Sequence, residues 1–207
     1  MKQPVGVILA GGQATRMGGG DKGRLMLGER SILGHVIDRM TPQVADIALN
    51  ANGEAGRFAD INLPVVADSV TGYAGPLAGV LAGLDWAGEL GADAIVTAAA
   101  DTPFFPCDLV PQLLMAAEDR RHCLALAASQ AADGKLWRQP TFGLWPVSLR
   151  NDLRDALQTG LRKVVLWTDK HDAGQAVFTH DGLDPFFNVN TPEDLAEARR
   201  LAGETTK

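Results

Sequence analysis

Short apolar runs alternate with amphipathic helical patterns over roughly the first 130 residues, and this alternation constrains the fold more than any other feature. Apolar runs of about four to eight residues predict strands that are buried on both faces of a sheet. Apolar residues at spacings of three and four predict helices that cover those faces. The predicted strands are residues 5–9, 46–50, 64–67 and 93–100, and the predicted helices begin after Ser31, at Pro76 and at Asp108.

Strands and helices in this order predict a three-layer α/β/α domain around a mainly parallel, Rossmann-like sheet. The rest of the chain continues the pattern less regularly, and residues 162–168 fit a helix or a strand equally well. No repeat or shift of composition marks a linker, so we expect a single domain over residues 1–207. Further strands are predicted at residues 123–129, 141–145, 175–179 and 186–189, and helices at residues 149–158 and from Pro192 onwards.

The charge and cysteine content exclude several classes of protein. The chain has 19 Lys and Arg against 25 Asp and Glu, a net charge of −6, which argues against a nucleic-acid partner. No apolar stretch approaches the length of a membrane span, and none resembles a signal peptide. Cys107 and Cys123 lack a zinc or disulfide spacing and are interpreted as buried residues of a protein in a reducing compartment. We therefore expect a cytoplasmic protein.

A glycine-rich segment follows the first predicted strand directly. Between Leu9 and Gly23 it contains six glycines together with Arg16 and Lys22. Glycines allow backbone N–H groups to approach phosphate oxygens closely, and the two cations can neutralise phosphate charge. A turn-forming surface loop is the alternative, but a position immediately after a buried strand favours phosphate binding. Residues 13–30 carry a net charge of +2, which suits a small polyanion in an otherwise acidic protein.

Two familiar phosphate-binding motifs do not fit this segment. Gly18, Gly20 and Gly23 have the dinucleotide-binding spacing, but they do not follow the strand directly. Lys22 follows Asp21 instead of glycine, and no Ser or Thr comes next, so the segment is not a Walker A loop. We therefore reject a dinucleotide-dependent oxidoreductase and the usual P-loop mechanisms.

Polar residues come directly after several predicted strands, where ligands bind in parallel sheets. Asp101 is placed to hold Mg²⁺ beside a phosphate substrate, although Asp before Thr-Pro also commonly forms a turn. Asp68 and Asn50 leave a similar choice between contacts to a base or ribose and the closing of a loop. The strand ends expected to precede the site are Leu9, Leu49, Ala67 and Ala100.

Five segments spread over nearly the whole chain carry motifs in a fixed order. They are Leu9-Ala-Gly-Gly with Arg16 and Asp21-Lys-Gly, Asn50-Ala-Asn52, Gly75-Pro-Leu-Ala-Gly79, Asp101-Thr-Pro103, and Phe187-Asn-Val-Asn-Thr-Pro-Glu-Asp194. With these motifs the chain resembles the molybdenum cofactor guanylyltransferases, which are nucleotidyltransferases of a glycosyltransferase-A-like (GT-A-like) fold. The opening motif alone would indicate only a wider nucleotidyltransferase superfamily.

The resemblance implies transfer of GMP from GTP to Mo-molybdopterin with release of pyrophosphate, and it implies Mg²⁺ as cofactor. It also implies delivery of the product to molybdenum insertion proteins, molybdoenzyme chaperones or apoenzymes. Asp101 is implied to bind both GTP and Mg²⁺, while Lys22 and Arg16 are expected to offset developing negative charge during catalysis. Asn188 and Asn190 are placed on the pterin side, unless they only form the turn before Thr191. The implied nucleotide contacts are Leu9, Ala10, Gly11, Lys22, Asn50, Asp68 and Asp101.

Some positions depart from the family pattern. The segment between Lys22 and Ser31 is about one residue shorter than usual, and Ser31 replaces a proline. Gln139 stands where some relatives carry histidine, so no catalytic histidine is assigned there. Two other functions stay open: a cytidylyltransferase that acts on the same pterin, and a non-catalytic nucleotide or cofactor carrier. The 75–79 segment is similar to the guanylyl enzymes and therefore favours GTP.

Overall fold

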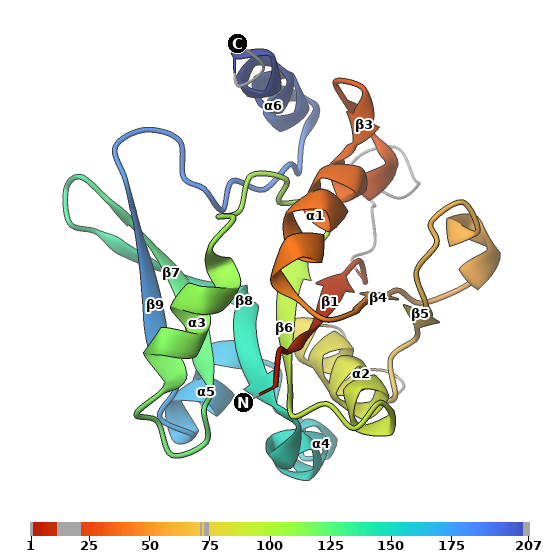
Figure 1. The fold of residues 1–207 in the computed structure, drawn as a ribbon, viewed down its shortest axis with the longest axis vertical. Coiled ribbons are helices and arrows are strands. Elements are labelled where there is room, and N and C mark those ends of the chain that lie inside the picture. The colour runs from red at the N-terminus through yellow and green to blue at the C-terminus, as the bar shows by residue number, and fades with distance from the viewer. Residues whose placement is uncertain (1, 12–21, 71, 73–74, 205–207) are drawn as a thin grey trace.

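The computed structural model describes residues 2–11, 22–70, 72 and 75–204, and a seven-stranded sheet forms its centre (Figure 1). The strand order is β5-β4-β1-β6-β8-β7-β9, and in this sheet only β8 runs antiparallel to its neighbours. The sheet is therefore mainly parallel, as the alternation predicts. Its strands are β1 (Val5–Leu9), β4 (Ile47–Asn50), β5 (Val65–Val66), β6 (Ala94–Ala99), β7 (Ala125–Ala131), β8 (Leu136–Pro146) and β9 (Gly174–His180).

Helices cover both faces of the sheet, which confirms the three-layer prediction (Figure 1). Successive residues of β1 face opposite layers: Ile8 belongs to the same buried cluster as Leu33, whereas Val7 belongs to that of Leu81. Among the described residues, no helix combines the length and the apolar character needed to cross a membrane. One layer contains α1 (Ile32–Met40) and α3 (Leu109–Ala117), and the other contains α2 (Pro76–Glu89), α4 (Arg150–Gln158) and α5 (Val164–Lys170).

A smaller hydrophobic cluster joins the last helix to a short hairpin. Leu27 and Ile32 pack there with Val189 and Leu195. The hairpin consists of β2 (Met26–Leu27) and β3 (Arg30–Ser31), and the helix is α6 (Pro192–Glu204). This cluster therefore holds the C-terminal part of the chain against the segment that follows Lys22.

Glycines bring α2 unusually close to the sheet. A Cβ atom on Gly79 would overlap the Asn50 side chain, and one on Gly83 would lie 2.7 Å from Cγ2 of Val7. Side chains at these two positions would force the helix away from β1 and β4. Gly79 and Gly83 therefore allow close packing of the helix on the sheet, and Gly79 leaves room for the Asn50 side chain at the end of β4.

The buried centre of the second layer contains a pair of tryptophans. Trp145 of β8 and Trp167 of α5 are fully buried and stack with ring centroids 6.1 Å apart. The indole N–H of Trp145 donates a hydrogen bond of 2.8 Å to the Thr97 hydroxyl, so its polar atom is also satisfied inside the core. This pair joins α5 to the sheet.

Of the two structures left open for residues 162–168, the helix is the one that forms: α5 spans Val164–Lys170, and one of its faces packs Val164 and Trp167 into the core. Two predictions about local structure need correction. Residues 186–189 do not form a strand: the Phe186 N–H donates to the Asp184 carboxylate, and the Val189 N–H donates to the Asp101 carbonyl. The strand predicted at residues 141–145 is longer than expected: β8 begins at residue 136 and forms a hairpin with β7.

The prediction that both cysteines are buried is also wrong. Cys107 is exposed and Cys123 is partly exposed, and both are free thiols. Cys107 precedes α3 in a surface loop, where the Arg39 guanidinium lies 3.1 Å from its sulfur. Cys123 nevertheless packs in part against the cluster that contains Leu33.

Candidate functional site

The carboxyl ends of β1, β4, β5 and β6 open into one cavity of about 1220 Å³. Backbone hydrogen bonds hold these ends in line: the Ala10 N–H donates to the Asn50 carbonyl (2.8 Å), and the Ala100 N–H to that of Leu9 (3.0 Å). Arg16 lies outside the described residues. The other predicted site residues all line this cavity, namely Leu9, Ala10, Gly11, Lys22, Asn50, Asp68, Asp101, Asn188 and Asn190.

Two asparagine amides hold the Asp68 carboxylate at one end of the cavity. Nδ2 of Asn50 donates to Oδ1 at 3.0 Å, and Nδ2 of Asn52 donates to Oδ2 at 2.7 Å. The Asp68 N–H donates in return to Oδ1 of Asn52 at 2.9 Å. Each carboxylate oxygen retains capacity for a further donor, so Asp68 can accept two N–H groups from a ligand.

Asn52 was not among the predicted site residues, although it lies in the same Asn50-Ala-Asn52 motif. The motif itself carried the signal, because residues two positions apart in extended chain point to the same side. Asn50 is only 2% exposed, whereas Asn52 is exposed. The buried amide fixes the carboxylate from the protein side, and the exposed amide fixes it from the rim.

Lys22 lines the same cavity and begins a short 3-10 helix, η1 (Lys22–Arg24). Its Nζ donates a hydrogen bond of 3.0 Å to Oδ1 of Asn190, which lies just before α6. The contact joins the segment after the glycine-rich loop to the C-terminal part of the chain. A fixed ammonium group in a cavity is suited to binding phosphate.

Asp101 lies just after β6 and lines the same cavity. Burial raises the pKa of its carboxyl, and the hydrogen bond with Thr102 and the positive charge of Lys22 oppose that rise. The Asp101 carbonyl accepts a 2.9 Å hydrogen bond from the Val189 N–H, so the backbone here is tied to the Asn188–Asn190 segment. The carboxylate is thus fixed in position beside a cationic group and at the wall of the cavity.

The donor set around Asp101 fits one kind of metal. The described residues contain no cluster of three or more His, Cys, Asp or Glu side chains that could hold an ion by themselves. Mg²⁺ commonly binds through one or two carboxylates and completes its shell with water and substrate phosphates. A single hard carboxylate on a polar cavity therefore suits Mg²⁺ delivered with a nucleotide, and not a structural zinc ion.

Further cavity residues lie in segments without a recognisable motif. Arg24 donates to Oδ2 of Asp60 at 2.9 Å, and the guanidinium carbon of Arg57 lies 4.9 Å from the centroid of the Phe58 ring. Thr141 of β8 lines the opposite wall. Sequence reasoning missed these residues because tertiary packing, and not local spacing, brings them to the cavity.

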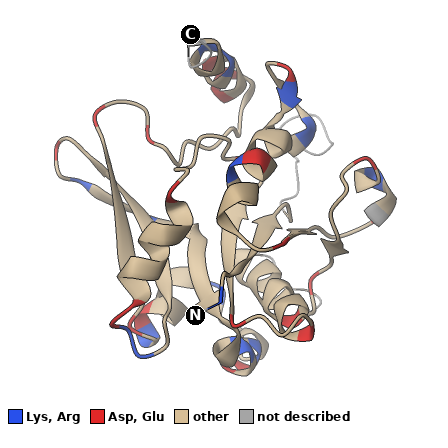
Figure 2. Ribbon diagram, viewed as in Figure 1, with Lys and Arg blue, Asp and Glu red and all other residues tan. Residues whose placement is uncertain are grey.

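Lys and Arg are otherwise interspersed with Asp and Glu over the outer helices (Figure 2).

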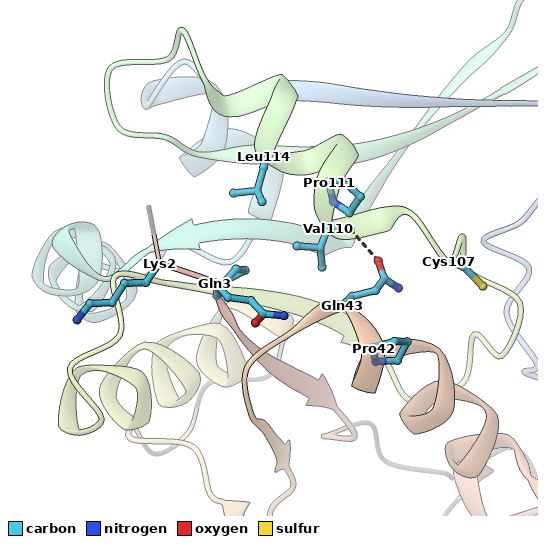
Figure 3. Close-up of a pocket in the computed structure, with 9 residues that line it drawn as sticks. Lys2, Gln3, Pro42, Gln43, Cys107, Val110, Pro111 and Leu114 are labelled. Atoms are coloured by element: carbon cyan, nitrogen blue, oxygen red, sulfur yellow. Dashed lines mark hydrogen bonds between the residues drawn. The ribbon is translucent and has the colours of Figure 1, made fainter.

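A second hollow of about 600 Å³ lies near the amino-terminal end of β1 (Figure 3). Gln43 lies in it, and its Oε1 accepts a 3.0 Å hydrogen bond from the Val110 N–H (Figure 3). Pro42, Pro111 and Leu114 give the hollow a largely apolar lining. It is remote from the strand ends that carry the predicted residues, so the larger cavity is the candidate site.

The chain is similar to known nucleotidyltransferases. Residues 6–173 match the model of the MobA-like NTP transferase domain. A molybdenum cofactor guanylyltransferase of Mesorhizobium japonicum is 47% identical over 206 residues, which are 97% of each chain. A molybdenum cofactor guanylyltransferase of Rhodopseudomonas palustris is 50% identical over 202 residues, covering 96% of this chain and 92% of the relative.

Solved structures share the fold at lower sequence identity. Molybdopterin-guanine dinucleotide biosynthesis protein A of Archaeoglobus fulgidus superposes with a TM-score of 0.72 at 21% identity, covering 97% of this chain and 99% of that one. The 4-diphosphocytidyl-2C-methyl-D-erythritol synthase of Anaerococcus prevotii also gives a TM-score of 0.72, at 16% identity and with 98% and 96% coverage. The three-layer architecture is therefore the GT-A-like fold of nucleotidyltransferases.

Proposed function

The chain belongs to the MobA-like NTP transferase family of molybdenum cofactor guanylyltransferases, and we propose that it transfers GMP from GTP to Mo-molybdopterin. One observation supports this most directly. The cavity at the strand ends is lined by Asp68, Lys22 and Asp101. They provide a hydrogen-bond acceptor for a base, a cation and a second carboxylate. A nucleoside triphosphate needs these three kinds of contact for its base, its phosphates and its metal ion.

The Asp68 end of the cavity suits guanine. The base presents two neighbouring N–H donors on its Watson–Crick edge, and both oxygens of Asp68 can accept them. Cytosine presents only one donor there, its amino group, beside a ring nitrogen and a carbonyl oxygen, so a carboxylate with two acceptor oxygens matches it less well. Asn50 and Asn52 hold the carboxylate in place, so the choice of base rests on a fixed group. Leu9, Ala10 and Gly11 would hold the nucleotide through their backbone at the end of β1.

The reaction requires alignment more than proton transfer. The terminal phosphate of the pterin is already ionised and can attack the α-phosphorus directly, with pyrophosphate as the leaving group. Lys22 would stabilise the negative charge that develops on the phosphates, and Arg16 is assigned the same role from its place in the motif. When bound, Mg²⁺ would add positive charge at the phosphate oxygens, and Asp101 is the residue proposed to hold it.

Other parts of the proposal follow from the family and the sequence. We assign residues 1–207 to one nucleotidyltransferase domain that works in the cytoplasm. We assign Asn188 and Asn190, which line the cavity, to the side that binds the pterin. Molybdenum insertion proteins, molybdoenzyme chaperones and apoenzymes are the partners to which the product would pass, and we expect neither nucleic acid nor membranes among the partners.

Incubation with GTP, Mg²⁺ and Mo-molybdopterin tests the proposal, with mass detection of the guanine dinucleotide and assay of pyrophosphate. We expect one dinucleotide per pyrophosphate released. Equal concentrations of GTP and CTP in the same reaction would reveal a cytidylyltransferase through the cytosine product. Binding of GTP without release of pyrophosphate, with loaded pterin present, would show a carrier instead.

A further inference from the structure

The side-chain oxygens of Asn188 and Asn190 are both engaged by donors from other parts of the chain. The Thr102 hydroxyl donates to Oδ1 of Asn188, and Nζ of Lys22 donates to Oδ1 of Asn190 at 3.0 Å. An amide whose oxygen is held in this way presents its NH₂ group elsewhere. In the described part of the chain, no side chain or carbonyl accepts a hydrogen bond from either Nδ2.

The backbone holds these two asparagines as a pair. Val189 between them is fully buried, and its N–H donates to the Asp101 carbonyl at 2.9 Å. The Asn190 N–H donates to the Asp194 carboxylate at 2.9 Å. Asn188 and Asn190 both line the cavity. The segment therefore offers two NH₂ groups from a fixed backbone, next to the ammonium of Lys22.

Thr102 connects this pair to the nucleotide side of the cavity. Its side chain is fully buried, and its Oγ1 lies 3.3 Å from Oδ1 of Asp101 as well as in contact with Oδ1 of Asn188. The hydroxyl is therefore shared between Oδ1 of Asp101 and Oδ1 of Asn188, and its contact with Asn188 holds the oxygen end of that amide. The hydroxyl therefore determines which end of the Asn188 amide faces the cavity.

We infer that Thr102 is a positioning residue: it orients the Asn188 amide so that its NH₂ group binds phosphate oxygens of the acceptor substrate. The inference rests on the proposed function, because it needs an acceptor with a phosphate group. Two NH₂ donors and an ammonium group match the lone pairs of a phosphate monoester. Thr102 follows Asp101 directly in the chain. Adjacent residues would therefore position the acceptor phosphate, through Asn188, and the nucleotide, through Asp101, next to each other.

Thr102→Val and Thr102→Ser test this inference, because valine keeps the shape of the side chain without the hydroxyl and serine keeps the hydroxyl. For Thr102→Val we expect about a tenfold rise in KM for Mo-molybdopterin, with KM for GTP changed less than about twofold. Thr102→Ser should restore the acceptor KM to within about twofold of the wild-type value. Equilibrium binding of metal-free molybdopterin, measured without GTP and Mg²⁺, should show the same pattern.

Thr168→Val is the matched control. Thr168 is equally buried, but its hydroxyl bonds the backbone carbonyl of Val164 within α5. This variant should leave both KM values unchanged, so it separates loss of a buried hydroxyl from loss of an oriented amide. A normal acceptor KM in Thr102→Val, or an equal loss of affinity for GTP, overturns the inference, and so does failure of serine to restore binding.

Variants of Asn188 complete the test. If Thr102 acts through Asn188, Thr102→Val should have no further effect on acceptor affinity in an Asn188→Ala background. Asn188→Asp replaces the NH₂ group with an oxygen and should weaken acceptor binding about a hundredfold. Undiminished binding by Asn188→Asp, or additive effects in the double variant, contradicts the inference. Failure of the wild-type protein to form any dinucleotide would instead contradict the proposed function.

Discussion

Nζ of Lys22 lies 3.0 Å from Oδ1 of Asn190, although 168 positions separate these residues in the chain. The hydrogen bond orders both partners at once: it fixes the ammonium group in the cavity and the amide of the asparagine. Lys22 follows the glycine-rich loop and Asn190 precedes α6, so the contact also joins the two ends of the chain at the site. The position of the Lys22 charge and the orientation of the Asn190 amide therefore depend on each other.

Replacement of Lys22 should slow the reaction strongly. We expect Lys22→Ala to lower kcat at least about a hundredfold at saturating GTP and Mg²⁺, because it removes a preorganised cation from the phosphates. Lys135→Ala is the control, since Lys135 is exposed and its Nζ lies 4.0 Å from the Trp137 ring, away from the cavity lining. Steady-state kinetics measures both variants. A near-normal kcat for Lys22→Ala would remove this residue from the mechanism.

Asp101→Asn separates the role of this residue in activity from its role in stability. Loss of the carboxylate should lower kcat about a hundredfold or more. Burial of the charged form of Asp101 raises its pKa and therefore lowers the stability of the folded protein. The neutral amide should therefore leave the thermal unfolding midpoint of the metal-free protein no lower than that of the wild type. Calorimetry without and with MgGTP measures this, and only the wild type should gain stability from added Mg²⁺ beyond that from GTP alone. Full activity in the variant would contradict the assignment.

The choice of base should depend on Asp68. Asp68→Asn replaces one acceptor oxygen with a donor, so we expect kcat/KM for GTP to fall about ten- to a hundredfold while the value for CTP changes little. Asp38→Asn provides the control, because Asp38 is an exposed carboxylate of α1 that pairs with Arg30 of β3. Competition between the two nucleotides gives the ratio directly. Equal losses for GTP and CTP would show that Asp68 does not recognise the base.

Close packing of α2 should matter for nucleotide binding. Gly79→Ala would bring a methyl group into the Asn50 side chain, which would displace the amide that holds Asp68. We expect at least a tenfold loss of GTP affinity and a lower unfolding midpoint. Gly203→Ala in α6 is the matched substitution: a Cβ there meets nothing within 4 Å, so helix propensity should make it neutral or slightly stabilising. Titration calorimetry and thermal unfolding measure these effects, and wild-type affinity in Gly79→Ala would refute the packing argument.

A carboxylate remote from the cavity should make stability depend on pH. Burial of Asp152 opposes its ionisation, but hydrogen bonds from His171, Trp167 and Lys170 outweigh this and lower its pKa. Since the pKa in the folded state is below that in the unfolded state, the stabilisation is present at neutral pH. It is lost as the pH falls through the folded-state pKa.

Asp152→Asn should accordingly lower the unfolding midpoint at pH 7 by up to about 3 °C, after allowance for solvent screening at this partly exposed group. The difference from wild type should shrink toward acidic pH. Asp119→Asn, a change at an exposed carboxylate, should leave the unfolding midpoint unchanged at pH 7 and at acidic pH. A constant difference across the pH range would mean that the charge of Asp152 does not contribute.

Much of the architecture could be predicted from the sequence because buried strands and amphipathic helices leave local patterns. Val5–Leu9 and Ala94–Ala99 are continuous apolar runs, and parallel strands require their ligands at the carboxyl edge, which located Asp101. Residues 186–189 had the composition of a strand but form none. Their backbone groups bond to Asp184 and Asp101, and only the tertiary structure provides those partners.

The candidate site likewise combines residues that local sequence patterns indicate with residues that only tertiary contacts bring together. Motifs indicated Lys22 and Asn50, and the end of a predicted strand indicated Asp68; all three line one cavity. The link from Thr102 to Asn188 spans 86 positions and leaves no periodic signal, so no local pattern could predict it. Asn52 lay within a recognised motif, but its role depends on the folded-back position of Asp68. Contacts across the sheet edge therefore remained beyond sequence reasoning.

The stacked pair of Trp145 and Trp167 allows folding and ligand binding to be observed separately. Neither indole lines the large cavity, and both are enclosed in the layer formed by α2, α4 and α5. Trp86 and Trp137 also lie outside that lining. The intrinsic fluorescence of the protein should therefore follow unfolding of the core and respond little to nucleotide. A substitution that weakens GTP binding while leaving the emission spectrum unchanged has altered the site and spared the scaffold.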